Sequence, residues 1–179
     1  MAKPQFVEPV KLLAAILWSD LTVVQTAVAQ LQERWGTIDF SGQDRPFDVT
    51  EYYQEEMGVD IRRRLVSFSR LIAPEGIVAA KLSCNEIEEE LSNNQRRRVN
   101  LDVGYLDHSK FVLASCKFSG QKIHLGRGVY ADLMGRYQAG RYRPFEWTFP
   151  DLRDGRYDSE LNQIRLTYLR QLRSGKTGL

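Results

Sequence analysis

The chain has 179 residues, a formal net charge of +2, 42% hydrophobic and 27% charged residues, values typical of a globular protein with one domain. No apolar run approaches the roughly 18 residues that a membrane-spanning helix needs, and the first residues lack a signal-peptide pattern. We therefore expect a cytoplasmic protein with no membrane segment, formed by one domain over residues 1–179 with loosely ordered termini at 1–9 and 174–179. Cys84 and Cys116 lack C-x-x-C spacing, and two histidines are too few for a histidine-rich metal cage.

Charge is distributed unevenly along the chain. Residues 1–90 carry a net charge of −6, and residues 91–179 carry +8. The two halves can complement each other inside one fold, which is the simpler interpretation. The second half can also present a basic face to an anionic partner.

The first predicted elements are a buried strand and an amphipathic helix. Residues 10–18 are nearly all apolar, which predicts a central strand buried on both faces. Ser19 and Asp20 offer a helix cap, apolar residues recur at helical spacing from Leu21, and Gly36 supplies the stop.

Strand formers dominate the next part. Residues 37–53 predict two short strand pieces around a loop at 41–46, and residues 61–72 predict their antiparallel partner. Pro74 is a good first residue for a second amphipathic helix ending near residues 92–94. Its apolar stripe is opposed by Lys81, Glu86 and the acidic run 88–90, and this acidic run is expected to be the solvated face of the helix.

The second half reads as strands followed by one helix. Period-two alternation over 99–104 predicts a strand within the segment 96–110, whereas periodicity does not decide between helix and strand for residues 111–118. A meander follows Gly120, with Pro144 on an edge strand. After a turn-rich linker, Asp158 and the apolar residues behind it predict a last helix.

This order of elements predicts an α+β fold. The first six elements match the split βαβ pattern of ferredoxin-like folds. We expect an antiparallel sheet with helices on one face, extended by a C-terminal β-meander and helix.

A candidate binding site is centred on residues 96–110. Three arginines precede a strand whose alternation places Asn100 and Asp102 on the face opposite its apolar residues. Arginine forks bind carboxylates and phosphates in bidentate fashion. Such a segment can also be solvated surface, or can hold the fold together through Arg–Asp pairs. The predicted ligand-binding residues are Arg97, Arg98, Asn100, Asp102, Tyr105, Lys110, Tyr52 and Tyr130.

Acidic residues at 51–56 add a second candidate feature. Carboxylates near a phosphate site suggest Mg²⁺, so Glu55 and Glu56 are predicted as metal ligands, with a solvated loop as the alternative. Asp102 and Glu55 are the candidate catalytic residues if the protein activates water.

Two further patterns concern nucleic-acid binding and phosphate binding. Tyr130, Tyr137, Tyr142, Phe145 and Trp147 interleave with arginines, a composition that suits either single-stranded RNA or an ordinary sheet packed on one face. Residues 174–177 read SGKT but lack the first glycine, the preceding strand and the following helix of a phosphate-binding loop.

The sequence resembles a prokaryotic family that is uncharacterised and defined as a domain of unknown function, some of whose members carry an automatic "GTP-binding protein" label. The resemblance covers nearly the whole chain. Val103 and Phe149 replace the proline and tyrosine of the family pattern, and neither change removes a charged group. The residues do not support the GTP label, because no Walker A or guanine-specificity motif is present. The motifs that carry the resemblance are PFDVTEYYQEEMG (46–58), RRVNLDVGYL (97–106), LGRGVYA (125–131) and WTFPD (147–151).

Three functional hypotheses follow. The first is a binding module for a phosphorylated small molecule or nucleotide, held in a cleft lined by Arg, Asp and Tyr. The second is a metal-dependent phosphoryl-transfer or hydrolytic enzyme that uses the same cleft. The third is an RNA-binding module. The first two require the arginine segment and the acidic segment, which are distant in sequence, to meet in space.

Overall fold

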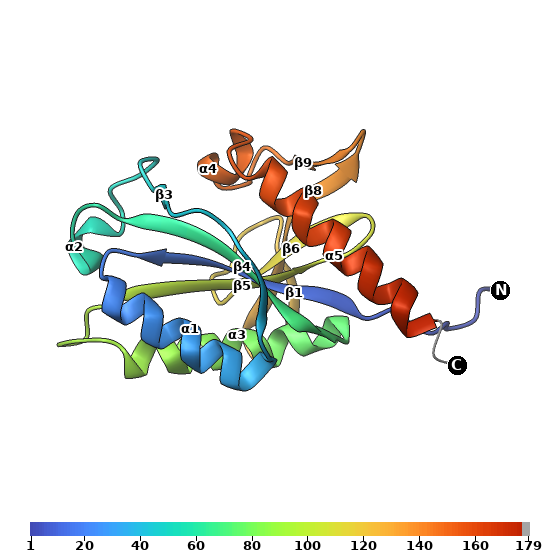
Figure 1. Cartoon of the computed structure of the whole chain (residues 1–179), viewed down its shortest axis with the longest axis horizontal. Coiled ribbons are helices and arrows are strands. Elements are labelled where there is room, and N and C mark those ends of the chain that lie inside the picture. Colours follow the sequence, from blue (N-terminus) through green and yellow to red (C-terminus); the bar gives the residue numbers. More distant parts are fainter. Residues whose placement is uncertain (177–179) are drawn as a thin grey trace.

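The computed structural model describes residues 1–176, in which helices lie against a large curved sheet (Figure 1). The elements in chain order are β1 (Val10–Trp18), α1 (Leu21–Trp35), β2 (Ile38–Ser41), β3 (Arg45–Pro46), α2 (Gln54–Met57), β4 (Arg62–Ile72), a 3₁₀ turn (Pro74–Gly76), α3 (Ile77–Glu90), β5 (Val99–Leu106), β6 (Lys110–Ser115), β7 (Ile123–Gly126), β8 (Val129–Gln138), β9 (Arg141–Pro144), α4 (Pro150–Arg153) and α5 (Asp158–Lys176).

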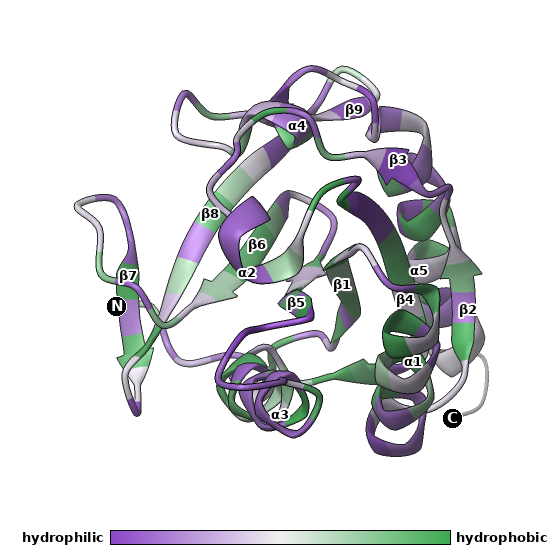
Figure 2. Cartoon of the chain, turned by 90° about the vertical axis from the view of Figure 1, so that its left-hand side faces the viewer, coloured by the Kyte–Doolittle hydropathy of each residue, from purple (hydrophilic) through white to green (hydrophobic). Residues whose placement is uncertain are grey.

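All described strands belong to one sheet. Its main path has the order β2-β4-β1-β5-β6-β8-β7, with β3 beside β4 and β9 beside β8. Every pairing is antiparallel. The sheet curves so strongly that β7 and β8 lie on one side of α2, and β2 and β4 on the other (Figure 2). The predicted α+β class with an antiparallel sheet is confirmed, while assignment to the ferredoxin-like folds stays a prediction.

Strand β1 is the centre of the core. All nine of its residues are buried, which confirms the prediction of a strand covered on both faces. Leu12, Ala14 and Ile16 pack in the cluster that contains α1 and α3. Leu13 and Ala15 pack on the opposite face against α5. The expectation of helices on one face therefore omits α5, which a strand apolar on both faces requires.

Local sequence signals set the bounds of α1. Asp20 accepts hydrogen bonds from the backbone N–H groups of Thr22 (2.8 Å) and Val23 (3.3 Å), so it caps the helix as predicted. Gly36 ends the helix with a φ of +89°, a conformation that glycine adopts without strain.

Several boundaries differ from the predictions. Residues 110–115, which periodicity left undecided, form β6. The short helix α2 follows the strand pieces predicted over residues 37–53. The short helix α4 lies in the stretch that was predicted as a turn-rich linker. Residues 1–9 have no regular secondary structure. Helix α5 continues to Lys176, so residues 174–176 are helical, and 177–179 lie outside the described residues. Among residues 1–176, no helix is both long and apolar enough to cross a membrane.

Candidate functional site

The candidate site lies where β5 and β6 separate. These strands pair only between Gly104–Leu106 and Phe111–Leu113. A Cβ atom on Gly104 would lie 2.1 Å from the carbonyl oxygen of Val112, so the close crossing needs a glycine. Beyond it the strands diverge around a pocket of about 210 Å³. The pocket is lined by Tyr53, Lys81, Asn85, Glu88, Arg97, Asn100, Asp102, Leu113, Ala114, Ser115, Cys116, Lys117, Lys122, Asp132 and Phe149.

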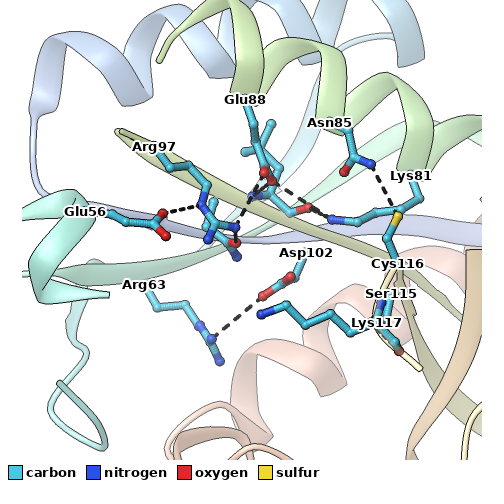
Figure 3. A network of polar contacts seen from close by, with 12 residues as sticks. Glu56, Arg63, Lys81, Asn85, Glu88, Arg97, Asp102, Ser115, Cys116 and Lys117 are labelled. Atoms are coloured by element: carbon cyan, nitrogen blue, oxygen red, sulfur yellow. Dashed lines mark hydrogen bonds and ion pairs between the residues drawn. The ribbon is translucent and has the colours of Figure 1, made fainter. Parts of the chain in front are cut away.

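Helix α3 satisfies the strand edge that β6 leaves unpaired. The backbone N–H of Leu101 donates to Glu88 Oε1 at 2.6 Å, and its carbonyl accepts from Lys81 Nζ at 3.0 Å (Figure 3). An unpaired backbone group in this buried position would be costly, so two side chains replace the missing strand. The acidic run 88–90 was predicted to be a solvated helix face. That prediction is wrong for Glu88, whose side chain is only 12% exposed, and Lys81, which was placed opposite the apolar stripe, is buried.

The charges of this wall stabilise each other. Burial alone would lower the pKa of Lys81, but the carboxylates of Asp102 and Glu88 outweigh it, and the pKa is raised. Burial raises the pKa of Glu88, and the Lys81 ammonium opposes that shift. Lys81 therefore stays cationic beside the pocket.

The arginine and acidic segments meet at this pocket. Arg97 Nε donates to Glu56 Oε2 at 2.9 Å, and Arg97 Nη1 donates to Asn100 Oδ1 at 2.8 Å. Arg97 Nη1 also lies 3.8 Å from the Glu88 carboxylate. Tyr53, from the same segment as Glu56, lines the pocket, and burial followed by the charge of Asp102 raises its pKa to about 12.

A buried arginine stands behind Asp102. Arg63 of β4 is 1% exposed, with its guanidinium over the rings of Phe47 (4.7 Å) and Phe149 (5.5 Å). Its Nη1 donates to Asp151 Oδ1 at 2.9 Å, and its Nη2 lies 4.0 Å from Asp102 Oδ2. The guanidinium thus compensates two carboxylates at the base of the site.

The opposite wall comes from the segment between β6 and β7 and from β8. Lys122 Nζ donates to Ser115 Oγ at 3.0 Å and lies 3.5 Å from Asp132 Oδ2. Lys117 donates to the Tyr52 hydroxyl at 3.0 Å, and its side chain extends toward Asp102 (Figure 3).

Comparison with known proteins gives one result. A family model described as a domain of unknown function (DUF4416) matches residues 8–168. The chain belongs to this family. The matched range contains every residue that lines the pocket of this DUF4416 member. Neither a search of curated proteins nor a search of solved structures found a match.

Only some of the predicted site residues line the pocket of this DUF4416 member. Arg97, Asn100 and Asp102 line it, and Tyr52 reaches it through Lys117. The other predicted residues lie outside the pocket lining and contact different partners. Arg98 pairs with Asp20 at the start of α1, Lys110 pairs with Asp107 and lies over Tyr105 at the far end of β5, Tyr130 packs against Phe118 and His124, and Glu55 is exposed on α2.

Glu56, a predicted metal ligand, and the aromatic residues of the meander contact other side chains of the protein. Glu56 contacts Arg97, and the part of the DUF4416 chain that the structure describes holds no group of three or more His, Cys, Asp or Glu arranged for a metal ion. In the meander proposed for RNA, Tyr142 is 3% exposed and Tyr137 packs beside it in the core under Arg165. These two rings support the fold rather than an open stacking surface.

Proposed function

We propose that the pocket between β5 and β6 binds a phosphorylated small molecule. The observation that carries this proposal is the convergence of basic side chains from three separate parts of the chain on one cavity: Lys81 from α3, Arg97 from the segment before β5, and Lys117 with Lys122 from the segment between β6 and β7. Ammonium and guanidinium groups at a partly enclosed site are the usual partners of phosphate oxygens.

Lys117 is the best placed of these groups to meet an incoming anion. Among residues 1–176, the Lys117 ammonium donates one hydrogen bond, which goes to the hydroxyl of the exposed Tyr52 and not to a carboxylate. Lys81 and Arg97, by contrast, already contact carboxylates. An anion that replaces the phenol therefore gains a charge-assisted bond without breaking an ion pair.

The size of the pocket restricts the ligand. Its volume of about 210 Å³ is below the roughly 300–1,000 Å³ of sites that enclose drug-sized molecules. A compact phosphate ester fits this volume better than a complete nucleotide, which narrows the sequence-based hypothesis.

The test uses titration calorimetry with methyl phosphate and two lysine variants. Lys117→Met should weaken binding about tenfold or more, because it removes a charged donor. Lys110→Met is the matched control. It removes the same charge at the far end of β5, where Lys110 pairs with Asp107, and should leave affinity within about twofold. Equal losses in both variants, or no binding of methyl phosphate by the unchanged protein, would refute the proposal.

We also propose a ferredoxin-like unit and a cytoplasmic location. The order β2-β4-β1-β5, its antiparallel pairings and the position of α1 and α3 together on one face support a ferredoxin-like unit extended by β6–β9 and α5. The free thiols of Cys84 and Cys116 support a reducing compartment such as the cytoplasm.

A further inference from the structure

We infer that the phosphate in this pocket is attached to a polyhydroxylated body, so that the ligand class is a sugar or polyol phosphate. This inference rests on the proposed function and concerns the part of the pocket that a phosphate would not occupy. It is carried by three buried polar atoms on the pocket wall.

These atoms have no hydrogen-bond partner within residues 1–176: Asn100 Nδ2, Asp102 Oδ2 and Asp132 Oδ1. Asn100 is 3% exposed and Asp132 is 6% exposed, and both side chains line the pocket. Buried polar groups in folded proteins are nearly always hydrogen-bonded, so these groups require partners from a ligand or solvent. Two acceptors and one donor are thereby offered to the contents of the pocket.

The carboxylates of Asp102 and Asp132 need uncharged hydrogen-bond donors and not a further cation. Asp132 already lies 3.5 Å from the Lys122 ammonium, and Asp102 lies 4.0 Å from the Arg63 guanidinium and raises the pKa of Lys81. Their charge is therefore compensated, while one oxygen of each lacks a hydrogen bond. Hydroxyl groups supply a donor without adding charge, and the Asn100 amide can donate to a hydroxyl oxygen.

The register of the sheet shows that these groups share one face. Asp132 pairs with Leu113, and Leu113 pairs with Gly104, two residues along β5 from Asp102. Side chains two residues apart on a strand point the same way, so Asp102 and Asp132 approach the pocket from the two sides of β6. The rings of Tyr53 and Phe149 also line the pocket and give apolar surface for the C–H groups of a sugar.

The experiment compares ribose 5-phosphate with methyl phosphate by titration calorimetry. The unchanged protein should bind ribose 5-phosphate about tenfold or more tightly than methyl phosphate, the gain expected from one or two satisfied hydrogen bonds. Asp132→Leu should remove this preference, and circular dichroism checks that the variant is folded. Asp132→Asn retains an acceptor oxygen and should keep part of the preference.

The outcomes separate this inference from the proposed function. Methyl phosphate and ribose 5-phosphate binding with equal affinity to the unchanged protein would overturn the sugar assignment and leave the phosphate site standing. A preference that survives in Asp132→Leu would also overturn it. Binding of neither compound would overturn both proposals.

Discussion

Substitution of Glu88 by leucine tests how α3 closes the open edge of β5. The variant removes the acceptor that lies 2.6 Å from the Leu101 N–H and the carboxylate 4.0 Å from Lys81 Nζ. A buried N–H without a partner costs about 1–3 kcal/mol, and breaking a buried ion pair costs about 3–5 kcal/mol. Lys81 keeps its hydrogen bond to the Leu101 carbonyl and the nearby charge of Asp102 in this variant. We therefore expect the free energy of unfolding to fall by about 3 kcal/mol.

The assay is urea unfolding of a double-mutant cycle. Lys81→Met in the Glu88→Leu background should cost less than in the unchanged protein, with a coupling energy of at least about 1 kcal/mol. Glu89→Leu is the control, because Glu89 is exposed on the same helix and its loss should change stability by no more than about 0.5 kcal/mol. Equal effects of Glu88→Leu and Glu89→Leu would refute the reasoning.

The same position has a predicted pH dependence. Burial raises the folded-state pKa of Glu88, so the folded protein favours the protonated carboxyl relative to the unfolded chain. Its stabilising contribution is complete below the unfolded pKa and is lost as pH rises through the folded value. Glu88→Gln keeps an acceptor and does not titrate. The free energy of unfolding of Glu88→Gln, measured by urea unfolding, should therefore rise relative to that of the unchanged protein as pH goes from acidic to neutral.

The remaining predictions concern the strand crossing, the helix cap and the thiols. Gly104→Ala should lower the free energy of unfolding by about 1–3 kcal/mol or more, because its Cβ meets the Val112 carbonyl, whereas Gly120→Ala, with open space, should be neutral in the same urea titration. Backbone N–H bonds, chiefly that of Val23, lower the pKa of Asp20, so its stabilising contribution exists above the unfolded pKa and fades as pH falls. The thermal stability advantage over Asp20→Asn should shrink on acidification. Cys116 is exposed and should react quickly with a thiol reagent. Cys84, buried with its pKa raised by burial, should react only on unfolding, and equal rates would contradict the packing.

Elements defined by local signals could be predicted from the sequence. The bounds of β1 and α1 follow from one apolar run, one capping aspartate and one stop glycine, all within a few residues of the element they define. Arg97, Asn100 and Asp102 could be proposed together because they share one short segment, in which strand alternation places Asn100 and Asp102 on the same face. The hypothesis that the arginine segment meets the acidic segment in space agrees with the ion pair between Arg97 and Glu56.

The other side of the pocket could not be predicted, because it depends on a tertiary feature. Lys81 and Glu88 look like a solvated helix face until β5 is left without a partner beside them. Lys122 and Asp132 enter the site only through the separation of β5 from β6. Arg63 had one available signal. Within the run Arg62–Arg64, strand alternation places the middle residue on the same face as the buried Leu65.

During synthesis, one face of the sheet stays uncovered until α5 has been made. Strand β1 is made before α5, yet its face that bears Leu13 and Ala15 packs against this helix. Tyr168 of that helix donates to the carbonyl of Pro9, just before β1, which joins two segments 159 residues apart in the sequence. A ribosome-bound intermediate that lacks α5 therefore exposes an apolar sheet surface, which is the kind of surface that chaperones bind and that aggregates form from.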